Sequence, residues 1–176
     1  DPALDLKDID INDYAIIDSL SRKYNKWCSG TGRLETHYIG APTSDIRIRI
    51  YDKALEQGKE GDWWRIECQL RRDYAEKYSL FNPFEHLTLV RKDVNLSHIK
   101  NFKEKVFIKH LLENPDDICN LSKNSRTKYK KILYDLARSD STKIDFSDVY
   151  ESYKNIIDKV IEDYTEISTP NNVIIF

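Results

Sequence analysis

The sequence lacks most of the features that place a protein in a well-known structural class. Its 176 residues include no methionine and only three cysteines, which are Cys28, Cys68 and Cys119. The cysteines form no CxxC pair and no even-numbered framework, so we expect no disulfide scaffold and a reduced, cytoplasmic setting. The sequence contains no run of about 18 apolar residues and no signal peptide, so we expect no membrane partner.

The motifs of common nucleotide-binding and hydrolytic enzymes are absent as well. The sequence has no Walker A motif, no GxGxxG, no GxSxG and no zinc-binding pattern. Charged residues make up 33% of the chain, but the net charge is only −2. Because the signs nearly cancel, the overall charge does not indicate a partner, and local clusters of charge have to be compared instead.

The first residue, Asp1, lies in a segment that already has the pattern of a strand. Together with the absence of methionine, this start leads us to expect a processed or truncated chain with further residues upstream. The length suits one domain, or one domain with an appendage, and 40% apolar residues are enough for a buried core.

Hydrophobic periodicity divides the chain into a strand-rich first part and a helix-rich second part. Alternating polar and apolar residues predict strands at 1–6, 33–40, 46–52 and 62–71. A period of 3.6 residues predicts helices at 12–27, 72–79, 98–113, 125–138 and 147–165. We therefore predict an α+β fold, with an antiparallel β-sheet in residues 1–80 and a helical part in residues 81–176. The role of the tail at 169–176 stays open.

The segment DIRIRIYDK, residues 45–53, alternates like a strand but has an unusual polar face. Its isoleucines point into a core, and the opposite face carries Arg47, Arg49, Tyr51 and Lys53. The strand at 62–71 alternates in the same way and has Arg65 and Glu67 on its polar face. Guanidinium groups match phosphate oxygens, a phenol can act as a covalent nucleophile, and a carboxylate can hold a divalent cation.

Patterning alone leaves two interpretations of this polar face open. It is either an ordinary solvated face with cross-strand ion pairs, or a surface for phosphoryl transfer through a tyrosine. Trp63 is a candidate for stacking on a nucleotide base. His37 shares a predicted strand face with Glu35 and is a weak candidate for a metal ligand, because a lone histidine on a polar face is more often ordinary surface.

A basic segment, KNSRTKYKK, lies in the helix-rich part of the chain. Its five cations are not interrupted by any acid, and they are Lys123, Arg126, Lys128, Lys130 and Lys131. A solvated helix usually mixes the two signs, so an unmixed run favours contact with a phosphate backbone. A solvated surface is an equally good interpretation of this segment alone.

Taken in order, four segments resemble those of the Rep-trans family of rolling-circle plasmid replication initiators, which are nicking-closing endonucleases related to HUH nucleases. The segments are DPALDL, ETHYIGAPTSDIRIRIYDK, WWRIECQLRRD and KNSRTKYKKIL. Two departures from the family pattern are present. Pro2 replaces the usual aliphatic residue between the acids, and the N-terminal strands of the family would have to precede Asp1.

The resemblance implies a function and a set of roles. Tyr51 would nick the plasmid double-strand origin, forming a 5′-phosphotyrosyl link and leaving a 3′-OH primer. The implied ligands of Mg²⁺ or Mn²⁺ are Asp1, Asp5 and Glu67. The implied phosphate clamps are Arg47, Arg49, Lys53 and Arg65.

The resemblance also implies partners. Residues 1–80 would be the catalytic sheet, and residues 81–176 would serve DNA recognition and dimerisation. The implied partners are origin DNA, with a single-stranded nick site and a duplex recognition element, a replicative helicase and a second copy of the chain. A relaxase of an integrative conjugative element and a non-catalytic DNA-binding module remain alternatives.

Overall fold

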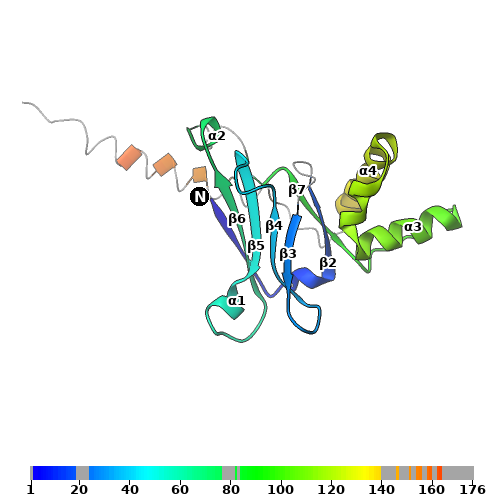
Figure 1. Ribbon diagram of the computed structural model, residues 1–176, viewed down its shortest axis with the longest axis horizontal. Helices are drawn as coiled ribbons and strands as arrows, with labels where there is room; N and C mark the ends of the chain where they lie inside the picture. Colours follow the sequence, from blue (N-terminus) through cyan, green and yellow to red (C-terminus); the bar gives the residue numbers. More distant parts are fainter. Residues whose placement is uncertain are drawn as a thin grey trace, which may run out of the picture.

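The computed structural model describes residues 2–18, 24–76, 82, 84–139 and 146, together with isolated residues between 151 and 163. Its fold is α+β, as the sequence predicts. The larger sheet has five strands in the order β1-β6-β5-β4-β3, and the smaller sheet pairs β2 with β7 (Figure 1). Every pairing between these strands is antiparallel.

The elements have the following bounds. The five strands of the larger sheet are β1 (Ala3–Lys7), β3 (Tyr24–Cys28), β4 (Leu34–Ile39), β5 (Ile46–Asp52) and β6 (Trp63–Leu70). The two strands of the smaller sheet are β2 (Tyr14–Asp18) and β7 (Leu87–Arg91). The α-helices are α1 (Lys53–Glu56), α2 (Asp73–Glu76), α3 (Phe102–Glu113) and α4 (Lys123–Ser139). Short 3-10 helices span Ile11–Asp13 and Pro115–Asn120.

The smaller sheet lies between the larger sheet and the helices, so the molecule has three layers. Ile16 and Leu89 pack with the core side of the larger sheet. On the other face, Ala15 and Val90 pack against α3 and α4 in a second core, whose helical members include Leu111 and Leu133. Figure 1 shows α3 and α4 together on one side of the larger sheet, with α1 at its lower end.

The alternation predicted for β5 and β6 is confirmed. Ile48, Ile50, Trp64 and Ile66 are fully buried on the core side of the sheet. Their chain neighbours point to the opposite, outer face, because successive side chains of a strand alternate. Burial of the isoleucines fixes the register, since a slip of one residue would exchange the two faces.

The predicted helix at 12–27 is wrong. The described part of this segment forms a 3-10 turn followed by β2, and then β3. The YAIID stretch of β2 is buried on both faces because it lies between two cores, and such a strand has a continuous apolar run instead of an alternating one. Trp27, at the end of the predicted helix, is 51% exposed on β3.

The helix-rich second part is largely as predicted, with one added strand. α3 and α4 confirm the helices expected at 98–113 and 125–138, within a few residues. Strand β7 was not expected, and it pairs with β2 across the proposed boundary at residue 80. The division into two parts at that boundary stays a prediction. The described residues do not include most of the helix predicted at 147–165, the end of the one predicted at 72–79, or the tail at 169–176. In the described ranges, no helix is long and apolar enough to cross a membrane.

Candidate active site

Tyr51 lies near the end of the central strand β5, on the outer face of the larger sheet. Its hydroxyl donates a hydrogen bond to Glu67 Oε1 on the adjacent strand β6, at 2.8 Å. The guanidinium carbon of Arg49 lies 3.8 Å from the centre of the Tyr51 ring, and Lys53 Nζ lies 5.6 Å from it. The residue is only 3% exposed, so neighbouring side chains cover it although it is not in the core.

The surroundings of Tyr51 favour its neutral phenol. Burial raises the pKa of the Tyr51 hydroxyl above its usual value, and the hydrogen bond and negative charge of Glu67 raise it further. The nearby Lys53 ammonium acts in the opposite direction but more weakly. The phenol therefore keeps its proton at neutral pH and needs a proton acceptor to act as a nucleophile.

Two arginines of β5 stand beside the phenol with different partners. Arg49 Nη1 forms a loose ion pair with Glu67 Oε2 at 3.6 Å. The Arg47 guanidinium stacks over the ring of Tyr38 on β4, at 3.9 Å from its centre. Over the described ranges, Arg47 has no carboxylate partner and its Nε has no hydrogen-bond acceptor. The positive charge of Arg47 is thus not neutralised by a carboxylate in the described ranges, and its guanidinium can pair with a phosphate.

Asp5 on β1 faces Arg65 on β6, and the two side chains form a bidentate pair. Arg65 Nε lies 2.6 Å from Asp5 Oδ1, and Arg65 Nη2 lies 2.8 Å from Asp5 Oδ2. These hydrogen bonds lower the pKa of the Asp5 carboxyl, so it stays ionised. Lys53 is held by an ion pair with Glu56 one turn along α1. Both predicted clamps, Arg65 and Lys53, therefore already have anionic partners.

Two of the three predicted metal ligands, Asp5 and Glu67, lie on the same face of the larger sheet. Asp5 and Glu67 are on adjacent strands, and Asp1 lies outside the described residues. Where the chain is described, no group of three or more His, Cys, Asp or Glu residues could hold an ion. The oxygen donors suit a hard divalent cation, and an ion on Asp5 shares that carboxylate with Arg65.

The chain is similar to replication initiation proteins. One, from Staphylococcus aureus, is 28% identical over 149 residues, which cover 81% of this chain and 46% of the relative. A second from the same species is 27% identical over 163 residues, covering 89% and 51%. The chain spans about half the length of the curated relatives it matches. No protein-family model matches the chain.

The five cations of the basic segment differ in their surroundings on α4. Arg126 donates hydrogen bonds to the carbonyl groups of Ile118, Cys119 and Leu121, and so holds the preceding 3-10 turn. Lys130 donates a hydrogen bond to the Asp18 carbonyl, and Lys128 forms an ion pair with Glu104. Lys123 and Lys131 are exposed on the helix surface. A DNA-binding role for these five stays a prediction.

His37 is not on the outer face, contrary to the weak metal-ligand hypothesis. Its side chain is fully buried opposite Ile50, and burial lowers its pKa from 6.5 to about 3. The alternation of RLETHYIG contained this information, because His37 has the parity of the apolar Ile39. By the same parity Thr36 and Tyr38 lie on the outer face, beside the polar residues of β5 that were expected there.

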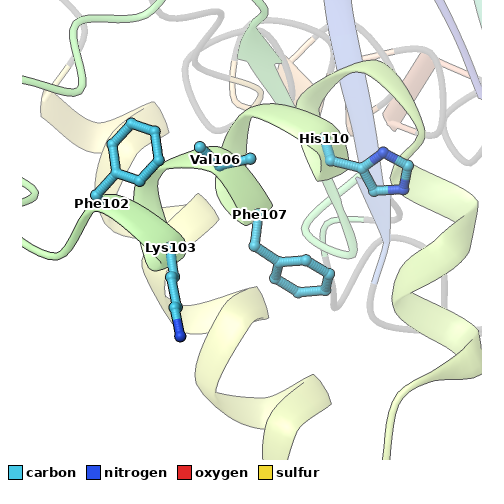
Figure 2. Close-up of a pocket in the computed structure, with 5 residues that line it drawn as sticks. All are labelled: Phe102, Lys103, Val106, Phe107 and His110. Carbon is cyan, nitrogen blue, oxygen red and sulfur yellow. The ribbon is translucent and has the colours of Figure 1, made fainter.

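A second surface feature lies on α3, away from the sheet face. Figure 2 shows a hollow lined by side chains of this one helix, and they are Phe102, Lys103, Val106, Phe107 and His110. Phe102 is 77% exposed and Val106 is 52% exposed. His110 Nε2 lies 2.7 Å from Asp117 Oδ2. The hollow is mainly apolar and brings together no set of groups for catalysis.

Proposed function

We propose that this chain is the DNA-nicking part of a replication initiator. Tyr51 attacks a phosphodiester at a plasmid double-strand origin, forms a 5′-phosphotyrosyl link and frees a 3′-OH that primes rolling-circle replication. The observation that carries the proposal is the Tyr51 phenol, which lies beneath Arg49 and donates its hydrogen bond to Glu67. Similarity to proteins named for replication initiation supports the biological role.

The chemistry needs one new bond and one broken bond. The Tyr51 oxygen bonds to phosphorus while the bond from phosphorus to the 3′ oxygen breaks. Glu67, which already accepts the hydrogen bond of the phenol, takes the phenolic proton as a general base. The 3′ oxygen leaves as a hydroxyl after taking a proton from water. The raised pKa of Tyr51 explains why an acceptor is required.

The arginines of β5 bind the phosphate in this proposal. Arg47 and Arg49 donate to its non-bridging oxygens and stabilise the charge that develops as the new bond forms. Both guanidinium groups rest on tyrosine rings, at 3.9 Å for Tyr38 and 3.8 Å for Tyr51. A bound phosphate competes for these cations, so it draws Arg49 away from the Tyr51 ring and uncovers the phenol, which can then attack the phosphorus.

A metal ion and further partners complete the proposal. When bound, Mg²⁺ or Mn²⁺ would polarise the scissile phosphate, and its proposed ligands are Asp1, Asp5 and Glu67, the last through Oε2, the carboxylate oxygen that does not accept from Tyr51. The origin supplies a single-stranded nick site and a duplex recognition element, which the helical part binds. A second copy of the chain and a replicative helicase belong to the complete initiator.

The decisive experiment removes only the nucleophilic oxygen. In the full-length protein, Tyr51→Phe keeps the ring beneath Arg49 but has no hydroxyl. We expect it to bind the origin and to form neither a nicked plasmid nor a covalent adduct. The assays are conversion of supercoiled origin plasmid to open circles with Mn²⁺, and a denaturing gel of protein with labelled single-stranded origin DNA.

The matched control is Tyr14→Phe, which removes a hydroxyl from β2 in the middle layer and leaves nicking unchanged. Nicking by Tyr51→Phe at the wild-type rate would overturn the proposal. Origin binding by the wild-type protein without an adduct on any strand tested would favour a non-catalytic DNA-binding module instead.

A further inference from the structure

A straight row of facing side chains crosses all five strands of the larger sheet. Trp27 on β3 faces Thr36 on β4, and Thr36 faces Tyr51 on β5. On the other side, Tyr51 faces Arg65 on β6, which faces Asp5 on β1. Because neighbouring strands lie about 4.8 Å apart, the backbone of Trp27 is about 10 Å from that of Tyr51.

Trp27 stands at the end of this row with much of its indole in water. It is 51% exposed, although a tryptophan is usually among the more buried residues. Its ring meets Tyr38 edge-to-face, with centroids 5.3 Å apart and planes at 81°. The strand register shifts between Trp27 and Cys28, and an irregularity of this kind re-aims a side chain. The exposed indole face is therefore held in place by an aromatic neighbour.

Cations adjoin this aromatic pair. The Arg47 guanidinium lies 3.9 Å from the centre of the Tyr38 ring, and that of Arg49 lies 5.9 Å from it. Arg47 has no carboxylate partner where the chain is described. Aromatic side chains on which bases stack, next to cations that follow the phosphates, are the combination that binds single-stranded nucleic acid.

We propose that Trp27 and Tyr38 form a stacking platform for an unpaired DNA base close to the phosphate that Tyr51 attacks. The proposal rests on the proposed function and gives the substrate a path, in which the single strand crosses the sheet along the row from Trp27 to Tyr51. A stacked strand rises about 3.4 Å per nucleotide, so the base lies within about three nucleotides of the scissile phosphate.

The platform favours single strands over duplexes. A base inside a duplex is stacked on both faces and cannot cover the Trp27 indole, whereas an unpaired base can. Every base has a π-face, so the platform holds the strand without reading its sequence. Recognition of the origin sequence is then left to other parts of the protein.

The experiment compares two strands that differ only in their bases. One is oligo(dT), and the other is an abasic strand of the same length, with affinity for the full-length protein measured by fluorescence anisotropy. We expect the wild type to bind oligo(dT) about 5- to 100-fold more tightly than the abasic strand. Trp27→Ala should lose most of this preference, and Trp27→Phe should keep most of it because it retains an aromatic ring.

Two controls separate the platform from folding and from catalysis. Val106→Ala on α3 alters a side chain of nearly the same exposed fraction, 52%, and should leave the preference unchanged. If Trp27→Ala does not fold, Tyr38→Leu is measured in its place, and it should also lose most of the preference. Tyr51→Phe should keep the full preference, since the hydroxyl is not part of the platform.

The outcomes for the platform and for nicking are distinguishable. Equal binding of both strands by the wild type, or an unchanged preference in a folded Trp27→Ala variant, would refute the platform even if Tyr51 nicks DNA. Loss of the preference in Trp27→Ala supports the platform, and it does so even if no phosphotyrosyl adduct forms, in which case the nicking proposal fails alone.

Discussion

His37 offers a test of the fold through the pH dependence of stability. The side chain is fully buried on the core side of β4, and burial lowers its pKa from 6.5 to about 3, with a smaller contribution from the charge of Lys26. Between these two values the unfolded chain binds a proton that the folded protein does not. The free energy of unfolding therefore decreases as the pH falls from about 7 towards 3.

The size of this effect follows from the two pKa values. At pH 5, the unfolded imidazole is almost fully protonated and the folded one is neutral, which lowers the free energy of unfolding by about 2 kcal/mol. At pH 7, the same linkage amounts to only about 0.2 kcal/mol. For a chain of this length, a loss of about 2 kcal/mol corresponds to a decrease in Tm of about 4–8 °C.

The variant His37→Leu has a side chain of similar size that does not titrate. Urea unfolding of both proteins at pH 7 and pH 5 gives the loss of stability for each. We expect the wild type to lose about 2 kcal/mol more than the variant between these pH values. Carboxylates contribute to the loss in both proteins, and their contribution cancels in the difference.

His98→Gln is the matched control, because His98 is exposed after β7. It should show the same pH-dependent loss as the wild type. An equal loss in His37→Leu and the wild type would refute the reasoning, because it would mean that the imidazole of the folded protein is protonated as easily as that of the unfolded chain.

Two further predictions separate structural roles from functional ones. Arg126→Ala leaves three carbonyl groups without their charged donor and should lower the free energy of unfolding by about 1.5–3 kcal/mol. The control Lys123→Ala, at an exposed position of the same helix, should change it by less than about 0.5 kcal/mol. Urea unfolding measures both values. Asp5→Asn removes one charge of a partly exposed ion pair, so the free energy of unfolding should change by less than about 1 kcal/mol. The rate of nicking at limiting Mn²⁺ should fall. A large loss of stability with unchanged nicking would contradict the proposed ligand role.

The local sequence pattern predicts the central strands and their outer face. In β5 and β6, the isoleucines and Trp64 alternate with polar residues, and this alternation predicted both the strands and the side on which Tyr51, Arg49 and Glu67 lie. The 3.6-residue periodicity of α4 predicted that helix in the same way. Such elements have one buried face and one solvated face, so the local pattern alone reveals their type and orientation.

The elements that are buried on both sides depend on tertiary contacts, and the local pattern does not predict them. The YAIID segment of β2 has no solvated face because it lies between two cores, so its apolar run resembled part of a helix. Strand β7 became part of a sheet by pairing with β2, from which it is separated by about 70 residues along the chain. Pairing over such a distance leaves no periodic signature in either segment.

The candidate site divides in the same way. The polar residues of β5 and β6 could be listed from the sequence, but their partners could not. Only the strand order put Asp5 opposite Arg65, and only the register aligned Trp27, Thr36 and Tyr51 in one row. The physical reason is that side chains on different strands come together through backbone hydrogen bonds and the packing of the layers, which neighbouring residues in the sequence do not encode.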